Sequence, residues 1–225
     1  MPRILPALAL LSALPAAGSG GDLAALIPEL TPPLLARLEA GEVVTRLIPI
    51  PGEKERQGLA ARLLAAPPER LFRALADPDH WPEWVPFLER SERPNGPAGA
   101  PVWSLAFDLP LPLRDRHYRA RVTTSEPAGE GAGLWTVSWD SVPGSGNIAS
   151  ARGAFTLARH GPKRTLVVFR TATDTGDHTP RILQERALLK SLPWLLDGLR
   201  QQAGRCRYSV PWADGCLEAR PWAPR

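Results

Sequence analysis

The chain has 225 residues, of which 44% are hydrophobic and 22% are charged, a composition typical of a folded globular protein. This composition excludes a wholly disordered chain, and no stretch reaches the roughly eighteen apolar residues that would cross a bilayer. The 27 basic and 23 acidic side chains give a net charge of +4, but the two kinds alternate and form no sustained basic run. We therefore expect no nucleic-acid partner.

The first residues have the pattern of a secretory signal peptide. One basic residue, Arg3, precedes an apolar run over residues 4–14, and small residues follow the run. The alternative is a buried N-terminal helix, which Pro6 and Pro15 disfavour. We expect residues 1–17 to be a cleaved signal peptide and the mature protein to be exported, with the periplasm as its compartment.

An N-terminal extension over residues 18–55 contains the first predicted elements. A short helix is predicted over residues 34–40, because Thr31 and two prolines precede it and Gly41 follows it. These are residue types preferred at the starts and ends of helices. Weak alternation over residues 42–50 then favours a strand.

The main domain is expected to begin at residue 56 with a strand and a helix. Residues 58–66 favour a strand, and the Pro-Pro-Glu sequence that begins residues 67–76 favours a helix. Residues 80–87 come next and are aromatic and interrupted by prolines, so no independent helix is predicted there.

Five segments with alternating apolar side chains follow, and turns rich in glycine and proline separate them. The predicted strands are residues 102–109, 114–125, 134–142, 148–160 and 163–174. Gly153 is expected at a bend or a close approach within its strand.

A long amphipathic helix over residues 180–203 ends the domain, and Pro193 is expected to kink it. The side chains expected on its apolar face are Ile182, Leu189, Leu192, Leu196 and Leu199. The order of elements predicts an α+β fold in which a curved antiparallel sheet wraps around the long C-terminal helix, with two short helices after the first strand.

Both cysteines of the chain, Cys206 and Cys216, lie in a C-terminal tail over residues 206–225. In an exported protein such a pair favours a disulfide over a metal site, and no histidine lies near it. We expect a disulfide that stabilises the fold by about 2.5–3 kcal/mol.

Five short motifs occur in a fixed order along the main domain. They are Ala-Ala-Pro-Pro-Glu-Arg-Leu-Phe at residues 65–72, an aspartate–tryptophan–proline segment at 75–86, Leu-Pro-Leu-Arg-Asp-Arg-His-Tyr at 111–118, residues 148–155, and the turn at 174–180 into a helix with Ser191-Leu192-Pro193. Together they resemble the START/polyketide cyclase superfamily, which has the helix-grip fold, over about residues 56–205. The resemblance implies a cavity between sheet and helix for an apolar molecule such as a lipid, sterol, quinone or polyketide.

Apolar side chains on alternate strand positions and on the long helix are the candidates for lining this cavity, although filling a core is their commoner role. The candidates are Trp84, Trp103, Phe107, Tyr118, Trp135, Trp139, Phe155, Phe169, Leu189, Leu192 and Leu196. Residues 81–86 form either a mobile lid at the cavity mouth or a static plug against the first helix of the domain.

Arg116 is the charged candidate. Strand alternation places it on the face of Tyr118, Ala120 and Val122, where it would meet the head group of a ligand. The alternative is a solvated strand end held by salt bridges.

We find no catalytic constellation in the sequence. The four histidines have no metal-ligand spacing, and no nucleophile elbow or phosphate-binding loop occurs, so neither a metal nor a cofactor is expected. The sequence therefore favours a carrier of a small hydrophobic molecule. The alternatives are a polyketide cyclase or aromatase-like enzyme, with His117 or Tyr118 moving protons, and a protein-interaction module. A carrier of this kind is compatible with transient contact with a membrane surface, and no pattern indicates an oligomeric state.

Overall fold

The structure is a computed structural model that describes residues 30–53, 55–93, 101–128, 133–161, 163–176 and 179–209. Within these residues, eight strands form one antiparallel sheet in the order β1-β2-β8-β7-β6-β5-β4-β3. The strands are β1 (Val44–Pro49), β2 (Arg56–Leu64), β3 (Leu88–Glu92), β4 (Val102–Phe107), β5 (Arg116–Ser125), β6 (Leu134–Ser141), β7 (Ser150–Arg159) and β8 (Thr165–Asp174). The predicted signal peptide and Cys216 lie outside the described residues, so cleavage and the disulfide with Cys206 stay predictions.

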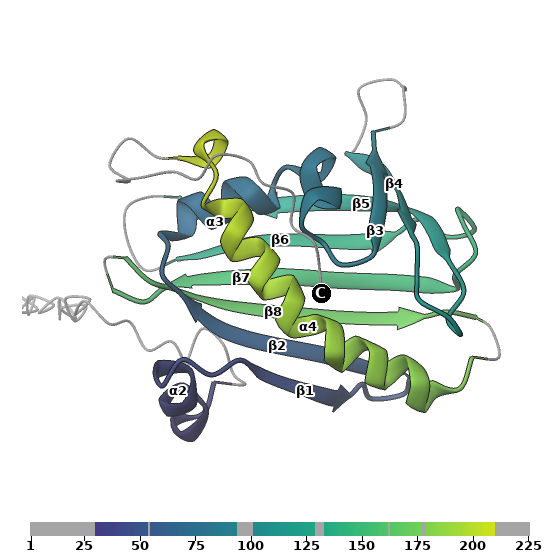
Figure 1. The fold of residues 1–225 in the computed structure, drawn as a ribbon, viewed down its shortest axis with the longest axis horizontal. Helices are drawn as coiled ribbons and strands as arrows, with labels where there is room; N and C mark the ends of the chain where they lie inside the picture. Colours follow the sequence, from purple (N-terminus) through teal and green to yellow (C-terminus); the bar gives the residue numbers. More distant parts are fainter. Residues whose placement is uncertain are drawn as a thin grey trace, which may run out of the picture.

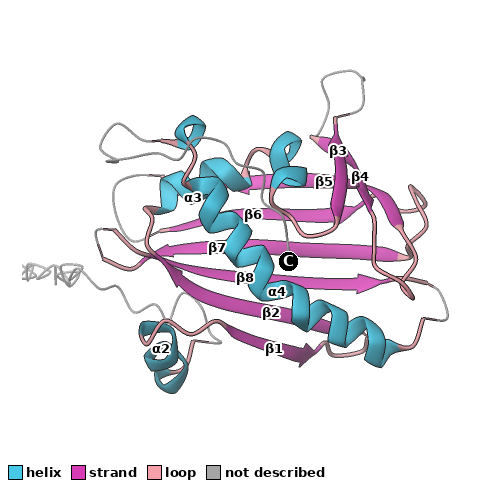
Figure 2. Ribbon diagram, in the orientation of Figure 1, coloured by secondary structure: helices cyan, strands magenta, loops and turns pink. Residues whose placement is uncertain are grey.

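The long helix α4 (Arg181–Ala203) crosses one face of the sheet diagonally (Figure 1). The helix α3 (Pro68–Leu75) and the 3-10 helix η1 (Pro78–Glu83) follow β2 and cover the same face, and a short 3-10 helix, η2 (Cys206–Tyr208), follows α4 (Figure 2). This arrangement confirms the predicted helix-grip fold. In the part of the chain that the structure describes, no helix is both long and apolar enough to cross a membrane.

Strand alternation decides which side chains face the helices. Along β5 the buried residues are Arg116, Tyr118, Ala120 and Val122, and the residues between them are exposed. The inward face predicted for this strand is therefore confirmed. The same alternation turns Trp135, Val137 and Trp139 of β6 inward, where they pack in or against the main core beneath α4.

Two expectations about the elements are wrong. β3 was not predicted, because its sequence Leu-Glu-Arg-Ser-Glu is mostly polar and resembles a loop; as a strand at the edge of the sheet it buries only Leu88 and Ser91. Ile182 does not lie on a buried face of α4, since 60% of it is exposed. The buried positions of the helix begin only at Leu192, because the first half of α4 borders a cavity.

A second, smaller core lies on the opposite face of the sheet. The helix α2 (Pro32–Glu39) buries Leu34 and Leu38 in it, against outward-facing side chains of β2 such as Leu59. The predicted helix of the N-terminal extension is present, and it covers strands β1, β2 and β8 from the side away from α4. β1 also lies within the predicted extension, yet it pairs with β2 from Val44 to Pro49.

Candidate functional site

A cavity opens between the sheet and the first half of α4. Its outer chamber has a volume of about 380 Å³. Leu188 and Trp194 of α4 form one wall, and Leu109 and Leu113 of the loop between β4 and β5 form another. This volume lies within the range of about 300–1,000 Å³ that is usual for small-molecule sites.

A second chamber of about 180 Å³ adjoins the first, and it is called the inner chamber because buried core residues line it. Its wall is mainly apolar and includes Leu192 and Leu195 of α4. Its aromatic side chains are Trp81, Trp84, Phe107, Tyr118, Trp139, Phe155 and Phe169. Because Pro86, Phe107, Tyr118, Thr173, Leu188 and Ser191 line both chambers, the two are parts of one cavity.

The inner chamber is built around a cluster of aromatic rings from neighbouring strands. The ring centroids of Phe155 and Phe169 lie 4.5 Å apart, and the indole of Trp139 lies 6.1 and 5.8 Å from them. Trp84 reaches Phe155 from the loop after η1, at 6.2 Å. Its Nε1 is buried and donates to no atom of the described residues.

Gly153 makes room for one of these rings. It is the partner of Trp139 across the β6–β7 pair, and a Cβ atom at this position would lie 2.3 Å from the indole. Only glycine therefore lets the Trp139 ring lie against β7 at this point. The predicted close approach at Gly153 is confirmed.

The outer chamber carries most of the charge. Arg116 begins β5 and is only 8% exposed. Glu185 of α4 places its Oε1 3.4 Å from Arg181 Nε and 4.0 Å from Arg56 Nε. Lys190 lies over the ring of Trp194, 5.6 Å from the centroid.

Tyr118 lies between the two chambers, where its ring stacks on Phe107 at 6.0 Å with an interplanar angle of 11°. Burial raises its pKa well above the ordinary value of a tyrosine. The hydroxyl is therefore neutral at physiological pH. It can donate a hydrogen bond to a ligand, but it is a poor general base or nucleophile.

Residues 81–86, predicted to be a lid or a plug, form part of the cavity wall. Trp81 Nε1 donates to the carbonyl oxygen of Leu75 at 3.0 Å, which fixes η1 to the end of α3. The next residue after the segment is Phe87, whose φ of 64° is unusual for a residue other than glycine. Phe87 lies 6.3 Å from Trp194 and helps to close the outer chamber.

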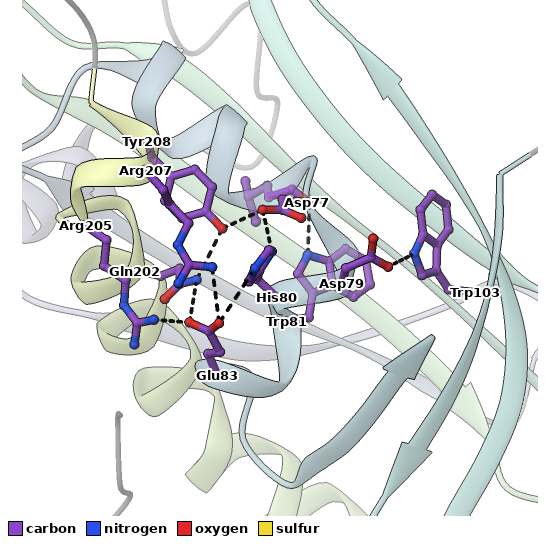
Figure 3. Close-up of polar contacts among 11 residues, drawn as sticks. Asp77, Asp79, His80, Trp81, Glu83, Trp103, Gln202, Arg205, Arg207 and Tyr208 are labelled. Atoms are coloured by element: carbon purple, nitrogen blue, oxygen red, sulfur yellow. Dashed lines mark hydrogen bonds and ion pairs between the residues drawn. The ribbon is translucent and has the colours of Figure 1, made fainter. Parts of the chain in front are cut away.

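A polar network joins η1 to the end of α4 and to η2 (Figure 3). Glu83 accepts hydrogen bonds from Arg205 and from Arg207, the latter at 3.2 Å. Tyr208 donates to Asp77 Oδ2 at 2.8 Å, and His80 Nδ1 lies 2.8 Å from the same oxygen. The network ties the segment to the end of α4 and to η2. The mobile lid and the static plug both stay predictions.

The structure brings most of the predicted cavity residues together. Those that line one or both chambers are Trp84, Phe107, Arg116, Tyr118, Trp139, Phe155, Phe169 and Leu192. Among the described residues, Trp103, Trp135, Leu189 and Leu196 line neither chamber and pack in or against the main core.

Two of these core tryptophans have their own polar neighbours. Trp103 Nε1 donates to Asp79 Oδ1 at 2.8 Å, and the Arg159 guanidinium lies 5.5 Å from the ring centroid of Trp135. Sequence reasoning missed Leu188, Trp194 and Phe87, which line the outer chamber. For Leu188 a signal existed, because it lies one turn before Leu192, which the sequence already places on the apolar face of the helix.

Comparison with known proteins agrees with this geometry. Residues 60–176 match the family model described as polyketide cyclase / dehydrase and lipid transport. This chain belongs to that family. The match extends from β2 into the loop before α4 and includes the strands that supply the aromatic cluster.

Solved structures share the fold of this chain at low sequence identity. A STAR-related lipid transfer protein fragment from Xanthomonas axonopodis is 20% identical, with 72% of this chain and 93% of that chain covered and a TM-score of 0.61. Human StAR-related lipid transfer protein 5 is 11% identical, with 72% and 82% covered and a TM-score of 0.58. The Zhui aromatase/cyclase from Streptomyces sp. R1128 is 17% identical, with 66% and 93% covered and a TM-score of 0.53. No curated protein sequence matches the chain. The predicted resemblance to the START/polyketide cyclase superfamily is confirmed.

Proposed function

We propose that the protein binds a small hydrophobic molecule noncovalently in the two-chamber cavity and carries it in the periplasm. The observation that supports this most is the inner chamber, whose mainly apolar, aromatic wall removes a ligand from water. The signal-peptide pattern of residues 1–17 supports export. The relatives in fold include lipid transfer proteins and an aromatase/cyclase. The mainly apolar wall of the inner chamber favours binding over catalysis.

Two features of the wall argue for a carrier over a cyclase-like enzyme. No histidine of the described residues lines either chamber, and His117 lies on the exposed face of β5. Tyr118 is the acid–base candidate that does reach the cavity, but burial raises its pKa and keeps it protonated. Among the described residues, the inner chamber therefore holds no histidine, carboxylate or lysine that could transfer a proton to or from a bound molecule.

We also propose that the outer chamber faces a lipid surface during loading. Leu111 is 93% exposed and Ile182 60%, and these are the large hydrophobic side chains exposed among the described residues. Their sequence neighbours Pro110 and Arg181 line the outer chamber. Apolar side chains beside exposed cations fit the boundary of an anionic bilayer.

Binding of the neutral apolar fluorophore N-phenyl-1-naphthylamine tests the carrier proposal. Leu188→Ala removes part of the wall shared by both chambers and should weaken binding by about three- to tenfold. Leu189→Ala is the matched control, because the neighbouring leucine is also half-buried but lines neither chamber. Equal effects of the two variants, or no binding by the wild type, would contradict the proposal. Native mass spectrometry of protein purified from its own compartment should show a retained apolar adduct.

A further inference from the structure

The outer chamber has an excess of positive charge. Among the described residues that line it, four are cationic and two are acidic: Arg56, Arg116, Arg181 and Lys190 against Glu55 and Glu185. Glu185 lies within 4.0 Å of both Arg56 and Arg181, so one carboxylate is shared between two guanidinium groups. A cavity with this balance attracts an anion more strongly than a cation.

Arg116 differs from the other cations of the chamber. Arg56, Arg181 and Lys190 are exposed, whereas Arg116 is 8% exposed and faces inward beside Phe107, its partner in β4. A charge in such surroundings is poorly screened by water, and a hydrogen bond to an anion is stronger there than at the surface. Among the cations of this wall, Arg116 is therefore the one whose interaction with an anionic head group is least screened by water.

The two chambers differ in the chemistry that they offer a ligand. The inner chamber is aromatic and aliphatic and holds no charged residue among those described, whereas the outer chamber holds Arg116 and the surface charges. Tyr118 lies where the chambers join, and its protonated hydroxyl is a second hydrogen-bond donor close to Arg116 in the strand. The cavity thus has an apolar end and a cationic end.

From this polarity we propose that the ligand is an anionic amphiphile, whose apolar part fills the inner chamber and whose acidic head group binds Arg116 in the outer chamber. The proposal rests on the carrier function proposed above and names its ligand class. The chamber volumes of about 380 and 180 Å³ suit a molecule with a single chain or a few rings. A carboxylate and a phosphate monoester share this head-group chemistry.

Three ligands with the same ten-carbon chain separate the alternatives: decanoate, decyl phosphate and neutral decan-1-ol. Each is titrated against the wild type with N-phenyl-1-naphthylamine already bound, and displacement gives its affinity. We expect the preferred anion to bind about tenfold or more tightly than the alcohol, as a charge-assisted hydrogen bond to a buried guanidinium requires. Comparison of decanoate with decyl phosphate shows which head group the chamber takes.

Variants assign the preference to Arg116. Arg116→Met should bring the affinity of the anion to within about twofold of that of the alcohol while leaving the alcohol unchanged, and Arg116→Lys should keep part of the preference. Arg119→Met is the matched control, because Arg119 lies on the same strand but is exposed on the opposite face. It should keep the full preference.

Each other outcome overturns the proposal in a distinguishable way. If the wild type binds the alcohol as tightly as both anions, the head-group assignment is wrong and the carrier function stands. If none of the compounds displaces the fluorophore, or the fluorophore itself does not bind, both proposals fail. If Arg116→Met folds and keeps the preference, the head group binds elsewhere. Should Arg116→Met fail to fold, the affinities of the wild type for anion and alcohol, together with those of Arg116→Lys, still test the head-group assignment.

Discussion

Both tyrosines of the chain, Tyr118 and Tyr208, are buried, at 9% and 4% exposure. Tyr118 is part of the cavity wall, whereas Tyr208 belongs to the network that fastens η1 to the end of α4. Desolvation raises the pKa of Tyr118, and desolvation together with the hydrogen bond to Asp77 raises that of Tyr208. The ionisation of Tyr118 therefore reports whether the cavity wall stays buried, and that of Tyr208 reports whether the network stays buried.

Alkaline titration should therefore show no tyrosinate in the native protein near pH 10, where an unperturbed tyrosine ionises. Because both folded pKa values lie above the unfolded value of about 10, their contribution to stability is complete below that pH and is lost as the pH rises through the folded values. Tyrosinate absorbance should appear together with the loss of far-ultraviolet circular dichroism. Tyr208→Phe should halve the amplitude. Ionisation of either tyrosine near pH 10 in a protein with native dichroism would contradict the burial described here.

At the scale of elements, alternation and turn residues predict most strands, because inward positions such as Tyr118 and Val137 are apolar and outward ones are polar. The local pattern gives the wrong result for two segments whose composition depends on their place in the fold. β3 is polar because it lies at the edge of the sheet, and the first turns of α4 carry the exposed Ile182 because they border a cavity. Neither the position at an edge nor the presence of a cavity is encoded in the local pattern.

The loop between β4 and β5 and the first turn of α4 should together bind anionic vesicles. We expect the double variant Leu111→Ser, Ile182→Ser to lower co-sedimentation with vesicles of phosphatidylglycerol and phosphatidylcholine several-fold, because it removes the two large exposed apolar side chains beside the outer chamber. Its affinity for N-phenyl-1-naphthylamine in solution should not change, since neither residue lines a chamber among the described residues.

Ala36→Ser is the control for this experiment, because Ala36 is exposed on α2, which packs on the opposite face of the sheet. If the double variant binds vesicles as the wild type does, these elements do not contact the lipid. If it loses the fluorophore as well, the two changes have disturbed the cavity, and the proposed separation between membrane contact and ligand binding is wrong.

At the scale of the whole molecule, one sheet separates two cores. The resemblance and the order of elements predicted the sheet and its long helix, but nothing in the local sequence divided the inward residues between cavity and core. Trp135 and Trp139 occupy the same face of β6, yet among these two only Trp139 lines a chamber. The difference arises from how α3 and α4 cross the sheet, which depends on the packing of the entire molecule.

The second core lets stability be separated from ligand binding. Leu38 of α2 is fully buried in the second core, on the face of the sheet away from both chambers. Leu38→Ala should lower the free energy of unfolding by about 2–5 kcal/mol, through lost burial and the cavity left behind. Denaturant titration measures this loss.

The affinity for N-phenyl-1-naphthylamine, measured well below the unfolding transition, should stay within about twofold of the wild type, because sites on opposite faces with no shared contacts act nearly independently. Leu188→Ala should weaken binding of the fluorophore more than Leu38→Ala does and lower the free energy of unfolding less, because Leu188 is a half-buried residue of the cavity wall. A folded Leu38→Ala protein with weakened binding would mean that α2 positions β2 and β8 for the cavity, and that the two cores act as one unit.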